Sequence, residues 1–404
     1  MGLFLCARNV PGASPCSPGS ARRGPPLPPM VSSLSTGAAE PIGRSLDVAP
    51  TPATPGGVAV PNARLRAAFI ALFVLIAVVS GMRNEQYLLF TPLPIPLLFL
   101  SPRGASRVLV FFALVLVVIG GAVTTYREGM AVPDWPATFQ ENMWTYSLRE
   151  MLEQGKGVTL EHVHRLWASA LGLVAFTVML TTYVHRSRRA LKAMAWATGG
   201  AIALQAVIGG TRVLEVSQNL AFLHGVIAQA VFATIAVLAV MSSRTWQRME
   251  RTRSAHAGGA YGLGPWVVGI LYFQIALGAW LRHHGQTAAL LVHGTFALAM
   301  VVLILVFARQ LGVAASEGRE RGIDRSPLRR LERLILGAVS AQFLLGILAT
   351  YGIYGISGGM EKEVSVGEAI FATGHVLVGA VLFCATVVGA VYARRTLTRE
   401  EVAA

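Results

Sequence analysis

Eight long apolar runs follow one another between residues 107 and 393, and they constrain the fold more than any other feature. They lie near residues 107–126, 160–184, 191–213, 219–242, 265–282, 287–308, 331–355 and 367–393. An α-helix rises about 1.5 Å per residue, so each run is long enough to cross a hydrocarbon core of ~30 Å. Because backbone groups in lipid must be paired within their own segment, the runs predict helices rather than strands. We therefore predict an all-α integral membrane protein with eight transmembrane helices.

The distribution of charge supports this reading and orients the helices. Charged residues make up 13% of the chain, whereas soluble domains carry about 25%. The net charge of +14 would suggest nucleic acid for a soluble protein, but the arginines lie in loops. Arginine-rich loops at 185–192, 243–256 and 309–330, and the tail, alternate with acidic or nearly uncharged loops. By the positive-inside rule both ends of the eight-helix unit are cytoplasmic and the 127–158 loop lies outside. We expect a multi-pass protein of the cell inner (plasma) membrane, with no nucleic-acid partner.

The first hundred residues have a different character. Residues 1–61 hold 12 of the 20 prolines and predict a disordered extension rich in Pro, Ser and Arg. Residues 62–106 contain two apolar stretches, of which the first is short for a span and the second is broken by prolines. This segment is compatible with a membrane hairpin, with poor order, or with an over-long start of the chain.

Histidines, rather than cysteines, are the candidate metal ligands. No Cys-x-x-Cys and no Cys/His cluster supports a zinc, iron–sulfur or disulfide framework, since the cysteines are only Cys6, Cys16 and Cys384. Four histidines instead lie near the starts of the even-numbered runs, at His164, His224, His293 and His375. All four of these helices are predicted to run from outside to inside, which places the imidazoles at one depth. Titratable groups inside spans are costly, so this placement points to function.

An internal repeat accompanies the histidines. The pattern Gln-x-x-x-Gly ends the third, fifth and seventh runs, with its glutamine at Gln205, Gln274 and Gln342. In the first two cases a histidine follows the glutamine by 19 residues, at His224 and His293. Repeated helix pairs predict two related, pseudo-symmetric four-helix bundles, residues 107–242 and 265–393.

Imidazole pairs on facing helices of a bundle suit a haem iron. Glycines beside three of the histidines would leave room for a flat macrocycle: Gly225, Gly294 and Gly374. Three arginines at the outer helix ends are candidates for contacts with haem propionates: Arg165, Arg212 and Arg282. The alternatives are a packed, hydrogen-bonded histidine, an arginine that only anchors at the interface, and glycine spacing that serves ordinary helix packing. Four histidines at one depth within a repeat favour haem.

Glu161 opens the second predicted helix, three residues before His164. Residues i and i+3 share a helix face, so its carboxylate would lie beside whatever His164 binds and would be placed for proton transfer. The alternative is a helix-terminal glutamate that interacts with the helix dipole. His162 is two residues from His164 and is predicted to face another way.

These features resemble the haem A synthase family. The resemblance rests on Gly120-Gly121, on EGMAVPDWP in the 127–158 loop, on LEHVHRLWASALG at the head of the second helix, and on the four histidine helices. It covers about residues 107–393. It implies eight helices in two pseudo-symmetric four-helix bundles, and a reaction that oxidises one ring methyl of haem O to a formyl group. The product, haem A, serves terminal oxidases.

The same resemblance implies a division of roles. The C-terminal bundle holds a haem b between His293 and His375, and the N-terminal bundle holds the substrate haem O between His164 and His224. Glu161 matches the essential glutamate of the family, which implies a role in proton handling or in charge stabilisation at the methyl. The haem b passes electrons away from the substrate haem. A haem O synthase and an electron acceptor are expected partners, beside membrane lipid.

One departure from the family pattern concerns the 127–158 loop. Many bacterial members carry a cysteine pair around the DWP motif, whereas this chain has Val132 and Thr138 nearby and no cysteine in the loop. How the loop is held is therefore open.

Two other functions remain compatible with the sequence. A bis-histidine di-haem electron-transfer protein without haem-modifying activity needs the same four histidines. A transporter or a non-catalytic assembly factor would use the bundles without haem. The spans carry few other polar groups that could form a solute path, which counts against the transporter.

Overall fold

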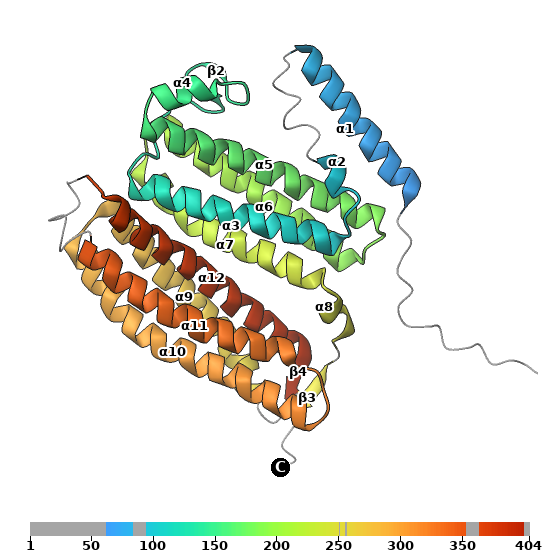
Figure 1. Ribbon diagram of the computed structural model, residues 1–404. Helices are drawn as coiled ribbons and strands as arrows, with labels where there is room; N and C mark the ends of the chain where they lie inside the picture. Colours follow the sequence, from blue (N-terminus) through green and yellow to red (C-terminus); the bar gives the residue numbers. More distant parts are fainter. Residues whose placement is uncertain (1–61, 84–93, 250, 255–256, 353–362, 400–404) are drawn as a thin grey trace, which may run out of the picture. The chain divides into compact units, whose positions relative to one another are not determined.

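Eight helices of the described chain are long and apolar enough to cross a membrane (Figure 1). This computed structural model describes residues 62–83, 94–249, 251–254, 257–352 and 363–399, all within the unit Val58–Ala404. The eight helices are α3 Pro102–Thr125, α5 Lys156–Val184, α6 Arg189–Leu214, α7 Gln218–Met241, α9 Ala257–His284, α10 Thr287–Glu320, α11 Ser326–Thr350 and α12 Val366–Thr396. Each overlaps one of the eight apolar runs, so the prediction of an all-α membrane protein with eight spanning helices is confirmed.

The ends of the helices follow capping chemistry rather than the limits of the apolar runs. The α3 helix begins five residues before its run, at Pro102, because the Ser101 side chain accepts a hydrogen bond from the backbone of Gly104. Proline suits the first position of a helix, where its missing N–H costs nothing. The α12 helix begins with a capping box formed by Ser365 and Glu368.

Four further helices and four strands complete the secondary structure of the described chain. They are the helices α1 Ala63–Arg83, α2 Pro94–Leu97, α4 Leu148–Glu153 and α8 Arg244–Arg248, and the strands β1 Ala137–Thr138, β2 Glu141–Asn142, β3 Thr252–Ser254 and β4 Leu397–Arg399. The β1 and β2 strands pair antiparallel, and β3 pairs parallel with β4. The predicted hairpin corresponds to α1 and α2, which contact each other and α5. Its connection, residues 84–93, lies outside the described residues, as does the predicted extension 1–61, so both stay predictions.

The spanning helices contact one another in two rings. In the first ring α3 contacts α5, α5 contacts α6, α6 contacts α7, and α7 returns to α3; α9, α10, α11 and α12 form the second ring in the same way (Figure 1). The rings meet where α12 contacts α3 and α7, and where α7 contacts α9. The pseudo-symmetry of the two groups stays a prediction.

The packed core and the candidate site occupy different parts of the helices. Along α10 the fully buried side chains of Ile304, Phe307 and Leu311 follow His293 by three turns or more. On α12 most side chains after Ala380 are likewise buried, whereas those around His375 are only partly buried. The helices therefore pack tightly in one half and leave space around the histidines in the other.

Candidate functional site

A cavity of about 990 Å³ lies among the eight spanning helices, and side chains from all eight line it. The four predicted ligands are among them: His164 on α5, His224 on α7, His293 on α10 and His375 on α12. The remaining lining is mainly apolar, with contributions such as Leu271 and Val376. The structure therefore brings together the four histidines that the sequence placed at one depth.

Each of the four imidazoles lies against a glycine of a neighbouring helix. An ideal Cβ on each glycine would lie between 2.7 and 3.0 Å from the Cε1 of its imidazole, in the pairs Gly120–His164, Gly209–His224, Gly278–His293 and Gly346–His375. Unbonded carbon atoms rest about 3.5–4.0 Å apart, so no side chain fits between ring and helix. These glycines let the Cε1 edge of each ring approach the neighbouring helix closely.

The glycines that the sequence analysis had chosen are different ones. Gly294 has nothing within 4 Å of an added Cβ, and the nearest atom to one on Gly225 is 3.5 Å away. The close contacts come instead from the glycines of the Gln-x-x-x-Gly repeat and from Gly120. The repeat had marked three of them, but only the packing shows which ring each one touches.

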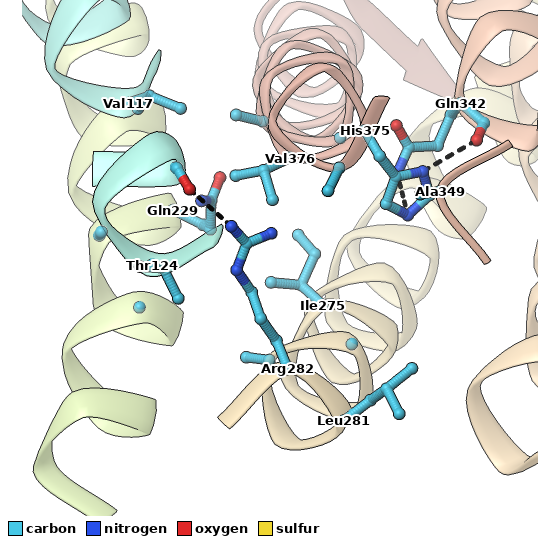
Figure 2. Close-up of a pocket in the computed structure, with 18 of the residues that line it drawn as sticks. Val117, Thr124, Gln229, Ile275, Leu281, Arg282, Gln342, Ala349, His375 and Val376 are labelled. Carbon is cyan, nitrogen blue, oxygen red and sulfur yellow. Dashed lines mark hydrogen bonds between the residues drawn. The ribbon is translucent and has the colours of Figure 1, made fainter. Parts of the chain in front are cut away.

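The His293 and His375 rings have the geometry of a pair that can share one iron. Their centroids are 6.4 Å apart and their planes differ by 80°. Imidazole nitrogens bind metals at about 2.0–2.1 Å, so two rings on opposite sides of one ion hold their centres about 6 Å apart. The Nδ1 of His375 lies 3.1 Å from the backbone carbonyl of Gln342 (Figure 2). Because a carbonyl only accepts, this bond places the proton on Nδ1. The lone pair of Nε2 faces the side-chain nitrogen of Gln342 at 3.1 Å, so this amide must move aside before Nε2 can bind a metal.

The donor set suits haem better than a bare metal ion. Within the described parts of the chain, no group of three or more His, Cys, Asp or Glu side chains could hold a metal ion. A haem supplies four iron ligands from its own ring, so the protein needs to provide only two imidazoles and an apolar cavity. The residues present therefore fit haem.

Two of the three predicted propionate arginines line the cavity. Arg282 reaches from the end of α9 to the first ring, where it donates to the carbonyl of Gly121 at 2.6 Å and to the Thr125 hydroxyl (Figure 2). Arg212, at the end of α6, donates to the carbonyl of Gly129 at 3.2 Å, and its Nε has no partner among the described residues. Both guanidinium groups are therefore available to an anionic group in the cavity.

Arg165 and Glu161 are directed to the 127–158 loop and are not among the cavity-lining residues. The guanidinium lies 2.7 Å from one oxygen of Glu161, whose other oxygen accepts from the Val132 N–H at 2.9 Å. Arg165 also donates to the carbonyls of Val132, Asp134 and Ala137 at 2.6–3.1 Å. Both side chains are buried. This ion pair holds the loop that the sequence had left without a cysteine, and the catalytic role of Glu161 and the propionate role of Arg165 stay predictions.

The DWP motif has a structural explanation in the same loop. The Asp134 carboxylate accepts from the N–H groups of Phe139 and Gln140, two residues with positive φ, and so fixes this turn. The Trp135 ring lies so close to α6 that a Cβ on Gly210 would be 2.3 Å from it. His162, on α5, also contacts the loop, because its Nδ1 lies 3.1 Å from the Thr138 hydroxyl.

Some lining residues were not recognised as site residues from the sequence. Gln205, Gln274 and Gln342 contact the histidines, and the repeat had signalled them only as a packing motif. His283, at the end of α9, also lines the cavity. Gln229 of α7 lines the cavity close to Arg282, and no sequence pattern marks it (Figure 2).

A family model for cytochrome oxidase assembly proteins matches residues 103–297. This part of the chain is similar to that family. The match runs from the start of α3 into α10 and includes His164, His224 and His293. No curated protein matches the chain.

Proposed function

We propose that the chain is a haem A synthase, an oxidoreductase that converts a ring methyl of haem O to a formyl group. The observation that carries the proposal is the single cavity lined by four imidazoles from both rings of helices. An enzyme that oxidises one haem with the help of another needs two haem sites close enough for electron transfer. The similarity of residues 103–297 to cytochrome oxidase assembly proteins supports this function, because haem A serves terminal oxidases.

The two imidazole pairs would serve two different haems. His293 and His375 would hold a resident haem b, and His164 and His224 would hold the substrate haem O. The haem b, when bound, supplies an iron that accepts electrons one at a time. The lining is mainly apolar, and Arg212 and Arg282 would pair with carboxylates at the edge of the substrate.

The oxidation removes several electrons and protons from the methyl group and adds one oxygen atom. The electrons leave through an acceptor outside this chain, and a haem O synthase would supply the substrate. By the positive-inside rule, the arginine-rich loops support a plasma-membrane orientation with both ends of the eight-helix unit cytoplasmic.

Glu161 would handle a proton at the substrate. Its carboxylate is bonded to Arg165 and Val132, so this contact must open before the carboxylate reaches the cavity. Glu161→Gln should abolish haem A formation while bound haem remains. Arg165→Met is the comparison variant, because it removes the ion pair and three further bonds to the loop and leaves the carboxylate in place. Equal loss of product in both variants would show that loss of the loop contacts is enough to explain Glu161→Gln, and would contradict the catalytic role.

The function is tested by extracting and separating the haems of the purified protein after co-expression with a haem O synthase. Haem B together with haem O or haem A is the expected result. Haem B alone, at two per chain and without haem A in the membranes, would identify an electron carrier. Protein without haem would refute both the synthase and the electron carrier, because both functions require the histidines to bind haem.

A further inference from the structure

We propose that three glutamines fix three of the imidazoles, and that Leu116 leaves the His164 ring as the one free to turn. The haem site that contains His164 is then the site that exchanges its haem. This inference rests on the proposed function, because it assumes that the imidazoles bind haem.

Gln205 and Gln274 hold their histidines in the same way. The amide nitrogen of Gln205 lies 3.1 Å from Nδ1 of His224 and 2.8 Å from the backbone carbonyl of the same residue. The corresponding distances between Gln274 and His293 are 3.1 and 2.9 Å. A primary amide carries both a donor and an acceptor, and the Oε1 of each glutamine is buried without a partner among the described residues. After a half-turn the same amide would accept from a protonated Nδ1, and its bond to the backbone carbonyl would then be lost, because a carbonyl oxygen only accepts.

Gln342 holds His375 by both ends of the imidazole. Its side-chain nitrogen lies 3.1 Å from Nε2, and its backbone carbonyl lies 3.1 Å from Nδ1 (Figure 2). When Nε2 binds a metal, the bond from Nδ1 to the carbonyl persists. Hydrogen bonds of this kind orient metal-binding imidazoles and raise their affinity for the metal.

The fourth histidine, His164, departs from this pattern. The other three histidine rings each contact a glycine, and the glutamine lies four residues before that glycine. The glycine in contact with His164 is Gly120. The residue four positions before Gly120 is Leu116, which lines the cavity. The side chain of leucine cannot form a hydrogen bond, and the Nδ1 of His164 is buried without a partner in the described chain. His164 is thus packed like the others but not fixed in rotation.

The asymmetry divides the two sites. Both imidazoles of the C-terminal site, His293 and His375, are held by glutamines, whereas only His224 is held in the N-terminal site. An imidazole that must also be oriented on binding forms a weaker bond to iron. The N-terminal site should release its haem first, which is what a substrate and product site requires.

The test measures haem transfer from the purified full-length protein, loaded in cells that make haem O, to an excess of apomyoglobin. Wild-type protein should lose its haems in two phases, and chromatography of each fraction should assign the fast phase to haem O or haem A. Leu116→Gln should slow the fast phase about tenfold, because one orienting hydrogen bond changes metal affinity by about 10–100-fold. Leu116→Met, which is similar in length and cannot orient the ring, should release haem at the wild-type rate. Gln274→Met, which removes the side-chain amide that contacts His293, should accelerate the slow phase about tenfold.

A spectroscopic signature separates ring orientation from general stability. The low-spin ferric signal of the fast-released haem should change in Leu116→Gln and stay the same in Leu116→Met. Equal release rates for the two wild-type haems, or equal effects of glutamine and methionine at position 116, would overturn the inference and leave the proposed function standing. Wild-type protein that carries no haem would overturn both.

Discussion

Replacing Gly278 by alanine should move the imidazole of His293 away from its binding position. The added Cβ would lie 2.8 Å from Cε1 and 3.3 Å from Nδ1 of that ring. Unbonded carbon atoms rest about 3.5–4.0 Å apart, so the ring must retreat by roughly 0.7 Å or more. The ring faces His375 across a centroid distance of 6.4 Å. Metal–ligand distances tolerate deviations of only about 0.2 Å, so the displaced pair no longer fits one iron.

The energies predict that haem binding suffers more than folding. Overpacking costs about 1–3 kcal/mol, whereas alanine is more favourable than glycine within a helix by about 0.8–1.0 kcal/mol. The net destabilisation of the fold is therefore about 0–2 kcal/mol, which most proteins survive. A weakening of the iron–imidazole contact by only ~1.4 kcal/mol already lowers affinity tenfold. We expect Gly278→Ala to fold and to lose at least nine-tenths of its affinity for the C-terminal haem.

The assay is the content of haem B per chain after purification, with the amount of folded protein measured by size-exclusion chromatography in detergent. Gly269→Ala is the matched control, because it lies on the same helix as Gly278, does not line the cavity, and an added Cβ there meets nothing within 4 Å. Full haem content in Gly278→Ala would refute the argument from close packing. Equal haem loss in Gly269→Ala would show that any added methyl on this helix is harmful, and would refute it as well.

Three further predictions concern regions away from the cavity. Trp135→Ala should loosen the 127–158 loop, since the ring packs against Gly210, and limited proteolysis should then cleave the loop faster than in wild-type protein. Arg325→Met should lower the unfolding free energy by about 1–3 kcal/mol, because the buried guanidinium donates to Thr252 at 2.6 Å and to a helix carbonyl, and thermal unfolding in detergent measures this. The Asp324 carboxylate accepts from the Ser326 N–H at 3.0 Å, which lowers its pKa. Its stabilising contribution is therefore complete above the usual carboxyl pKa of about 4 and is lost as the pH falls through the lower folded value. Stability measured between about pH 6 and 2 should show this loss in wild-type protein and not in Asp324→Asn.

The sequence predicts the eight helices well because the length of an apolar run is a local property. It also predicts the four histidines as one set, since their positions on alternate helices depend only on counting. It does not predict where helices end outside the membrane. The α10 helix continues twelve residues past its apolar run to Glu320, partly because Glu317 and Arg321 form an ion pair one turn apart.

The rotation of each helix about its axis is what the sequence leaves open. Arg165 lies one residue after His164, yet one side chain is directed to the loop and the other to the cavity. The same limit applies to the glycines. A Cβ on Gly278 would contact the His293 ring, whereas a Cβ on Gly294, the residue after His293, would meet nothing within 4 Å. Such distinctions depend on contacts between segments far apart in the chain.

The arrangement of the cavity itself favours a synthase over an electron carrier. A carrier needs two haems close together and gains nothing if one of them is held less firmly. An enzyme whose substrate is a haem must release it after each turnover, while its resident haem stays in place. Three glutamines at equivalent positions, and Leu116 at the fourth, produce this inequality within one repeated packing pattern. His164, the histidine without an orienting partner, belongs to the pair assigned to haem O. The site that holds haem less firmly is therefore the site from which a synthase must release its product.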